Sequence, residues 1–329
     1  MNGNPIDTFS ALLLKLYRAS AETALESYQD AALDILKPVL PFDSCMWGTA
    51  TYLDGQGIDV HSIHLHNEPQ EMMDEYEPVK HLDTAASAMA NRPFLATRGF
   101  HNPSYFAGPD AGELRDYLRR FGHENSFITA HTDQRTGATQ WLTLFRADVD
   151  HLCRPEEVHL LHQMAPHLMQ GLQHNRILHS GRLSAQAGTL GHETAVADAH
   201  GVLCHATPGC EDMLRTEWGA AARCGRLPAP LLEWLRATDA PFIGRTLLAR
   251  RQVRKDLLFV RLRPLCAADG LAPRQREVAE LMARGLTHKQ AAQRLGLSPA
   301  TVRNQIQSVY DKLGVGNVAA LVDALRLAD

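Results

Sequence analysis

Several patterns that would assign a function directly are missing from this sequence of 329 residues. No stretch approaches the roughly twenty consecutive apolar residues of a transmembrane helix. The N-terminus, M-N-G-N-P-I-D, lacks the basic start and apolar run of a signal peptide. There is no G-x-x-x-x-G-K-[ST] phosphate loop, no G-x-S-x-G nucleophile elbow and no H-E-x-x-H zinc helix. We therefore expect a cytoplasmic protein with no membrane partner, no catalytic residues, no metal and no cofactor.

The six cysteines include no C-x-x-C pair. Scattered thiols in a cytosolic chain are mostly small buried hydrophobic side chains. A thiol-based sensor is the alternative interpretation, and Cys204 with Cys210 is the first place to look for it.

Charge is distributed unevenly along the chain. Residues 271–329 hold eight Lys and Arg against five Asp and Glu, a net charge of +3. Since the whole chain carries −4, the remainder carries −7. This asymmetry is expected when only the C-terminal part meets a polyanion.

The same C-terminal segment contains two helices joined by a tight turn. Thr287 can cap a helix in which Gln290 reaches back to the capping residue, and Gly296 ends that helix. Ser298, followed by proline, caps the next helix, which ends before Gly314. The spacing therefore predicts a helix-turn-helix motif over residues 287–306.

The second of these helices has one apolar and one polar face. The apolar stripe, which must face inward, consists of Val302, Ile306, Val309 and Leu313. The opposite face consists of Ala300, Arg303, Asn304, Gln307 and Asp311. Arginine can bond guanine bidentately and asparagine or glutamine can bond adenine, so this face is suited to reading a major groove.

Further helices are predicted from Pro273 to Arg284 and from Asn317 to Leu327, giving four in a short segment. At this point the chain resembles the LuxR-type, or GerE/FixJ-like, helix-turn-helix family. The resemblance rests on L-A-P-R-Q-R-E-V, R-G-L-T-H-K-Q-A-A, R-L-G-L-S-P-A-T-V-R-N-Q and K-L-G-V. It implies a transcriptional regulator that acts as a homodimer on double-stranded DNA, together with RNA polymerase.

The resemblance also implies roles for individual residues. Base contacts would come from Arg303, Asn304 and Gln307. Backbone contacts would come from Lys289, Ser298, Thr301, Gln305 and Lys312. The dimer helix would present Val318, Leu321, Val322 and Leu325. Family members usually have threonine where Ala272 stands, so we expect the first helix to lose its cap and ~1 kcal/mol of stability.

The alternative for this segment is a helical bundle that binds only protein. An apolar exposed face would favour that interpretation, and the exposed face here is polar.

The N-terminal half predicts an α+β domain. Apolar spacing between residues 9 and 36 suits one or two helices, and residues 44–53 and 58–66 alternate like strands around D-G-Q-G. Residues 92–109, rich in proline and glycine, predict a long loop. Residues 126–132 and 139–146 form a predicted hairpin, and Pro155 begins a long helix. This order resembles a GAF-type sensory domain, most clearly in D-S-C-M-W-G and P-E-E-V-H-L-L-H-Q-M-A-P-H-L.

Beyond a small, polar linker at 181–191, residues 194–207 resemble the opening of a short, degenerate PAS domain. Short helices are predicted at 208–217 and 230–237, and closing strands at 245–263. We therefore expect a multidomain chain: a GAF-like domain at 1–180, a PAS-like domain at 192–265 and an all-α four-helix domain at 266–329.

Two candidate sites in the N-terminal half remain. Aromatic residues that are candidates for lining an effector pocket are Trp47, Tyr76, Phe94, Tyr105, Phe106 and Trp141. His61, His64 and His66 share one strand, where we expect an exposed polar face; a metal site would need further ligands from elsewhere in the fold. The function expected is DNA-binding regulation controlled by an unknown small molecule, and the alternative is a metal- or thiol-based sensor or enzyme.

Overall fold

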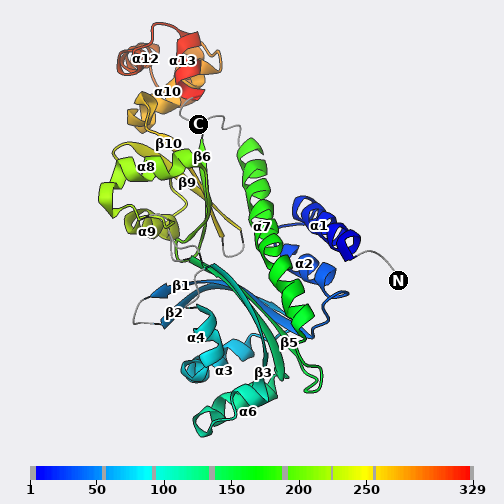
Figure 1. Ribbon diagram of the computed structural model, residues 1–329. Helices are drawn as coiled ribbons and strands as arrows, with labels where there is room; N and C mark the ends of the chain where they lie inside the picture. Colours follow the sequence, from blue (N-terminus) through cyan, green and yellow to red (C-terminus); the bar gives the residue numbers. More distant parts are fainter. Residues whose placement is uncertain are drawn as a thin grey trace.

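The computed structural model describes residues 5–53, 57–90, 94–132, 138–186, 192–223, 225–254 and 257–326. Two antiparallel sheets with helices are followed by a group of helices at the C-terminal end (Figure 1). The predicted class, α+β units followed by an all-α unit, is confirmed. No helix in the described part of the chain has the length and apolar character needed to cross a bilayer.

The first sheet has the strand order β2-β1-β5-β4-β3. Its strands are β1 (Ser44–Leu53), β2 (Gly57–His66), β3 (Phe94–His101), β4 (Asn125–Thr132) and β5 (Ala138–Arg146). The predicted strands at 44–53 and 58–66 and the predicted hairpin are confirmed, because alternation and turn residues were strong there.

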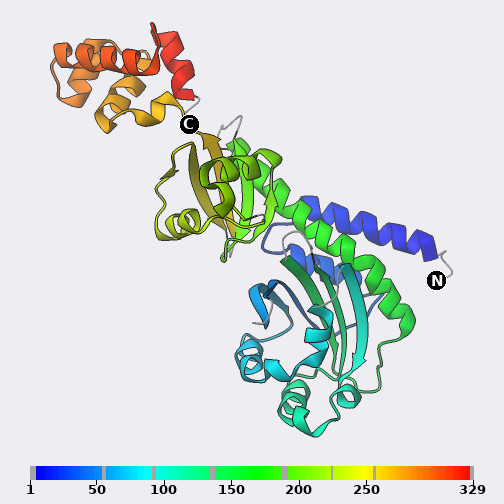
Figure 2. The same cartoon turned by 60° about the vertical axis from the view of Figure 1, so that its left-hand side comes forward.

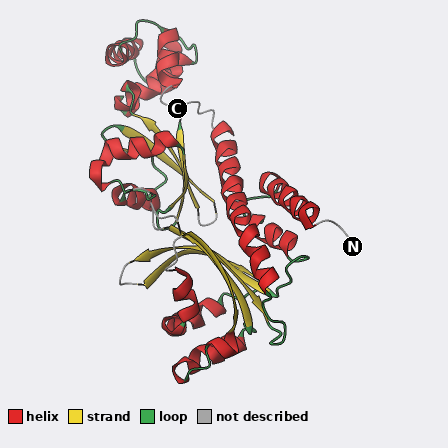
Figure 3. Ribbon diagram, in the orientation of Figure 1, coloured by secondary structure: helices red, strands yellow, loops and turns green. Residues whose placement is uncertain are grey.

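Helices cover both faces of the first sheet (Figure 3). One face packs against α1 (Pro5–Glu22), α2 (Tyr28–Leu36) and the long α7 (Pro155–Gln186), with Trp47, Leu142 and Leu168 in the shared core. The other face packs against α3 (Glu71–Val79), η1 (Lys80–Leu82), α4 (Thr84–Ala90), α5 (Asn102–Tyr105), η2 (Pro109–Ala111) and α6 (Gly112–Arg120). The order of helices, strands, hairpin and long helix on which the GAF resemblance rests is present, with β3 and α5 in place of the predicted loop.

The long loop predicted at 92–109 is wrong. Residues 94–101 form the edge strand β3, which pairs with β4, and the following residues form α5. An edge strand tolerates glycine, and Gly99 allows a close approach: a Cβ added there would lie 2.5 Å from Cβ of Cys153. The glycine therefore marks packing rather than a loop.

The second sheet repeats the order of the first, as β7-β6-β10-β9-β8. Its strands are β6 (Glu193–Asp198), β7 (Leu203–Ala206), β8 (Phe242–Ile243), β9 (Leu247–Arg254) and β10 (Leu257–Pro264). Helices α8 (Pro208–Trp218), η3 (Gly219–Ala221) and α9 (Ala229–Ala237) lie between β7 and β8 in sequence. The predicted short helices and closing strands are thus present, while the PAS-like character of this region remains a prediction.

Helix α7 connects the two sheets. It packs on β3 and β4 of the first sheet and on β6 and β7 of the second. The predicted linker at 181–191 needs correction, since residues up to Gln186 continue the helix; residues 187–191 lie outside the described ranges.

Side chains also join the two α+β units directly. Arg226 Nη2 donates to Thr51 Oγ1 over 3.2 Å. Nδ1 of His61, on β2, lies 3.2 Å from Oδ2 of Asp198, at the end of β6, and both side chains are buried.

The C-terminal helices, hereafter the head, are η4 (Ala267–Gly270), α10 (Pro273–Ala283), α11 (His288–Leu295), α12 (Pro299–Leu313) and α13 (Val318–Arg326). They enclose their own core, which includes Val278, Ala292, Val302 and Leu321. In Figure 2 the head lies at the far end of the molecule from the first sheet.

Candidate nucleic-acid interface

The helix-turn-helix of the head is fixed by the caps that the sequence predicted. Thr287 Oγ1 accepts from the backbone N–H of Gln290, and the Gln290 side chain accepts from the N–H of Thr287. Gly296 ends α11 in the left-handed conformation at φ 66°. Ser298 Oγ then accepts from the N–H of Thr301, which begins α12. The capping box, the turn glycine and the second cap are all confirmed.

Helix α12 divides into the two faces expected. Val302, Ile306 and Val309 are buried in the core of the head. Arg303, Asn304 and Gln307 are exposed on the other side. Because the helix is anchored from behind and its polar face is open to solvent, nothing in the described chain prevents it from entering a groove.

The side chain of Gln307 is held by a hydrogen bond on this face. Its Nε2 donates to Oδ1 of Asp311 over 3.0 Å, one helical turn away. The acid therefore orients the amide before any DNA is bound. A hydrogen bond to adenine from this amide would have to replace or share that contact.

The residues predicted to hold the DNA backbone lie in two kinds of environment. Lys289, Ser298 and Lys312 are exposed, whereas Thr301 and Gln305 are half-buried. The hydroxyls of Ser298 and Thr301 are 2.8 Å apart, so the helix cap already engages both of them.

Lys312 belongs to a small polar network with α10. Its Nζ donates to Oε1 of Gln275 over 2.8 Å, and Gln275 Nε2 donates to Oγ of Ser308 over 3.0 Å. The partner is a neutral amide, so the positive charge of Lys312 is not cancelled by this contact. It remains available to a phosphate.

The expectation that α10 loses its cap is wrong in part. Ala272 has no side-chain acceptor, but its backbone N–H donates to Oε1 of Gln275 over 3.2 Å. Half of a capping box is therefore kept by the glutamine three residues into the helix.

The predicted dimer face of α13 also needs correction. Leu321 and Leu325 are buried in the core of the head. Val318 is 38% exposed and Val322 is half-buried. The four apolar residues of α13 are therefore one buried pair and one accessible pair. A short helix that covers a core has an apolar stripe facing that core, and the sequence pattern did not separate this stripe from a dimer face.

The aromatic residues predicted to line an effector pocket are Trp47, Tyr76, Phe94, Tyr105, Phe106 and Trp141. Those whose side chains the structure describes do not all lie on the same face of the first sheet. Trp47 is buried on the α7 face of the first sheet, while Tyr76 and Phe106 belong to the core of the opposite face. Trp141 packs over Gly48, and Tyr105 is 45% exposed. The Phe94 side chain lies outside the described residues. Alternation along β1 directs Trp47 to the face opposite the one that α3 and α5 cover, and the aromatic content of the sequence does not show this.

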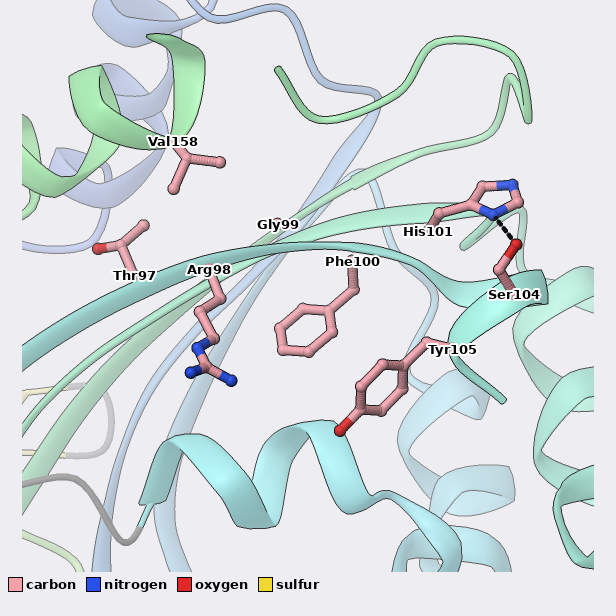
Figure 4. A pocket seen from close by; sticks show the side chains of 8 residues that line it. All are labelled: Thr97, Arg98, Gly99, Phe100, His101, Ser104, Tyr105 and Val158. Atoms are coloured by element: carbon pink, nitrogen blue, oxygen red, sulfur yellow. Dashed lines mark hydrogen bonds between the residues drawn. The ribbon is translucent and has the colours of Figure 1, made fainter. Parts of the chain in front are cut away.

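An open depression of about 630 Å³ lies at the edge strand β3, and of the predicted aromatics it includes Tyr105 (Figure 4). Arg98 and Phe100 line one side of the strand and Thr97 and Val158 the other. His101 Nδ1 and Ser104 Oγ are joined by a 2.6 Å hydrogen bond at its end. Its openness contrasts with ligand pockets, which bury most of a small molecule.

The thiol pair considered for redox sensing is not assembled. Cys210 is buried among α8 and the sheet, whereas Cys204 packs with Val196 and Phe259 in a separate cluster. Burial raises the pKa of Cys204, and burial raises the pKa of Cys210 to about 12. Both thiols therefore stay protonated near neutral pH, which disfavours redox reactivity.

The exposed polar face predicted for the histidines of β2 is wrong. His61 is 8% exposed, and the His64 and His66 side chains are 10% and 11% exposed. Both His64 and His66 contact Asp30 of α2. No local pattern in the sequence predicts Asp30 as the partner of these histidines.

Sequence reasoning also missed the joint between the second sheet and the head. Arg263, in β10, donates two hydrogen bonds to the carboxylate of Asp269 in η4, at 2.6 and 2.7 Å. The same carboxylate accepts from the backbone N–H of Cys266 and lies 3.8 Å from Arg276 of α10. An acid five residues after the end of β10 was the available signal.

Comparison with known proteins places this head among regulators. The family model "Bacterial regulatory proteins, luxR family" matches residues 269–325. The spore germination protein GerE of Bacillus subtilis is 43% identical over 60 residues, which are 18% of this chain and 81% of GerE. An HTH-type transcriptional regulator of Mycobacterium tuberculosis is 41% identical over 63 residues, or 19% of this chain, but the match spans only 7% of that relative.

Among solved structures, the N-acylhomoserine-lactone-dependent LuxR-family transcription factor CepR2 of Burkholderia cenocepacia is similar to 50% of this chain. The similarity covers 92% of that chain, with 20% identity and a TM-score of 0.37. The match to GerE covers most of that protein, and the residues matched by the family model run from η4 into α13 of the head. Through this helix-turn-helix segment, the chain belongs to the LuxR family of bacterial regulatory proteins.

Proposed function

We propose that this protein binds specific double-stranded DNA sites through α12 and regulates transcription from them, without catalysing a reaction of its own. The observation that supports this most is the exposed face of Arg303, Asn304 and Gln307 on a helix held by two caps and a buried stripe. In this proposal those three residues contact base edges, and Lys289 and Lys312 contact phosphates.

We further propose that an effector or partner acting on the N-terminal region controls the head. The support is a chain of contacts from the first sheet to the head. Helix α7 packs on both sheets, and the Arg263–Asp269 pair fixes the last strand of the second sheet to the head. A shift of the second sheet would therefore move α10 and α12 with it. Control then requires that the effector bind the two arrangements with different affinities.

The active form in this proposal is a homodimer that reads two half-sites and contacts RNA polymerase. Val318 and Val322 of α13 remain accessible for the contact between heads. Analytical ultracentrifugation of the full chain with and without DNA tests this. A 1:1 complex with a palindromic site at saturating protein would contradict the dimer.

The test of base reading uses DNA selected by the full chain from a random library. Arg303→Ala should weaken binding to the selected site by about 1–3 kcal/mol, roughly 5- to 150-fold, and change binding to random DNA little. Lys289→Ala should weaken both equally and lower the salt slope by about one. Fluorescence anisotropy at several salt concentrations measures both effects.

Arg215→Ala is the matched control, because Arg215 is an exposed arginine of α8, outside the head. Equal losses on selected and random DNA for Arg303→Ala would contradict base reading by that residue. Absence of any salt-dependent DNA binding would instead favour a bundle that docks only to protein.

A further inference from the structure

Three potential metal ligands meet between α2 and the edge strand β2. Nε2 of His64 and Nδ1 of His66 each lie 2.8 Å from Oδ1 of Asp30. The two histidines are two residues apart on one strand, so they share a face of the sheet, and α2 supplies the acid from above that face. Within the described ranges, this is the group of three such side chains close enough to share an ion.

The two histidines are fixed by their surroundings, while the acid is open to solvent. Both imidazoles are nearly buried, and in the β1–β2 register His64 lies opposite Trp47 and His66 opposite Cys45. The Asp30 carboxylate is 47% exposed. An ion can therefore reach the cluster from the acid's side while the histidines are held in place by packing.

The chemistry of the three groups is that of an open transition-metal site. Two imidazole nitrogens and one carboxylate are the protein ligands of many catalytic zinc and non-haem iron sites, which leave positions for water or a substrate. Without an ion, each imidazole nitrogen that faces the carboxylate must carry a proton, because a carboxylate only accepts. An incoming ion would displace those protons to the other ring nitrogen or to solvent.

The geometry needs only a small adjustment. Ligand atoms about 2.1 Å from a zinc ion are about 3.4 Å apart at a tetrahedral angle. The nitrogens now lie 2.8 Å from Oδ1 of Asp30, so the acid would have to withdraw by roughly half an ångström. Its exposure leaves room for this movement.

We propose that Asp30, His64 and His66 bind one divalent transition-metal ion, such as Zn²⁺, with the remaining coordination positions open to water or a small-molecule ligand. The simpler interpretation is a polar contact that only attaches α2 to β2. The carboxylate stays charged in either case: burial raises the pKa of Asp30, but hydrogen bonds from His66 and His64 outweigh this and the pKa lies below its ordinary value.

The proposed metal site lies on a strand that also contacts the second sheet. Strand β2 has a bulge opposite the Thr49/Ala50 step of β1, and His61 at this bulge approaches Asp198 of the second sheet. An ion that fixes His64 and His66 would thus fix the strand that carries the contact between sheets. This route, unlike the metal site, rests on the proposed control of DNA binding.

The test uses the full chain, purified without a polyhistidine tag, stripped with a chelator and titrated with Zn²⁺ by calorimetry and with Co²⁺ by absorption. We expect one ion per chain. Asp30→Asn, His64→Gln and His66→Gln should each weaken binding at least ~100-fold, since loss of even an outer-shell partner typically costs 10–100-fold. His159→Gln, which removes an exposed histidine of α7, should leave the affinity unchanged.

A positive signal guards against variants that merely misfold. Asp30→Cys replaces the carboxylate with a thiolate ligand and should add a cobalt–thiolate charge-transfer band that the unsubstituted chain lacks. No stoichiometric binding, equal affinity in the ligand variants, or absence of that band in a folded Asp30→Cys chain would overturn the proposal. None of these measurements involves DNA, so they can fail while the proposed DNA binding stands.

Discussion

The head takes its proposed DNA contacts from one continuous stretch, residues 289–312, whereas the first α+β unit brings Asp30 to His64 across 34 positions of chain. In the head, neighbouring residues cap helices, end them and present one face. In the first unit, the groups with chemistry meet only after a sheet has formed and a helix has packed on it. The proposed DNA-binding face is therefore local in sequence, whereas the proposed metal site depends on tertiary packing.

Stability follows the same contrast. In the head, single caps such as Thr287 on α11 fix helix ends through neighbouring residues, while in the first unit a buried arginine joins segments that are distant in sequence. Arg146 of β5 donates to both carboxylate oxygens of Glu157 on α7, at 2.8 and 3.1 Å, and to the carbonyl of Pro41 at 2.8 Å. Its guanidinium also lies 4.8 Å from the Phe127 ring centroid.

The largest effect is expected for Arg146→Ala. The Arg146 side chain is 1% exposed, and its removal deletes both hydrogen bonds to Glu157 and those to backbone carbonyls such as that of Pro41. It should therefore lower the free energy of unfolding by about 3–5 kcal/mol. Urea unfolding followed by tryptophan fluorescence measures it, because Trp47 is buried in the adjoining core. Arg119→Ala, at an arginine that is 69% exposed, should change the same free energy by less than about 0.5 kcal/mol. Similar losses in the two variants would contradict the role of the buried Arg146 in joining distant segments of the first unit.

How much the sequence could predict follows from this difference. Capping residues, the turn glycine and the inward stripe of α12 act over a few positions, so they predicted the head almost element by element. For β3, proline and glycine content suggested a loop, because the sheet neighbour that makes residues 94–101 a strand is not visible locally. The pairing of Asp30 with β2 and the separation of Trp47 from Tyr76 likewise depend on strand parity and helix packing.

An intermediate effect is expected at the joint between the two kinds of region. Burial raises the pKa of Asp269, but hydrogen bonds from Arg263 and from the backbone of Cys266 outweigh it and lower the pKa to about 2. A depressed carboxyl pKa stabilises the folded chain above the unfolded pKa of about 4, and that contribution is lost as pH falls toward 2. The shift corresponds to about 2 kcal/mol.

Comparison with Asp269→Asn isolates this contribution. Amide hydrogen exchange in η4 and the start of α10 should show the variant less protected near neutral pH. The difference from the unsubstituted chain should shrink between pH 4 and pH 2. A difference that stays constant over this range would show that the acid's charge does not hold the joint.

The smallest effect is expected from giving α10 the side-chain cap that Ala272 cannot supply. Ala272→Thr would give α10 a side-chain acceptor for the backbone N–H of Gln275, while Gln275 keeps its existing bond to the N–H of residue 272. Because half of the box is already present, we expect a gain of about 0.5–1 kcal/mol in the stability of α10, seen as slower amide exchange in its first turn. Ala272→Val, which adds similar bulk without an acceptor, should give no such gain. Equal protection in the two variants would mean that the glutamine alone already satisfies this helix end, and that local capping contributes less to the head than its sequence suggests.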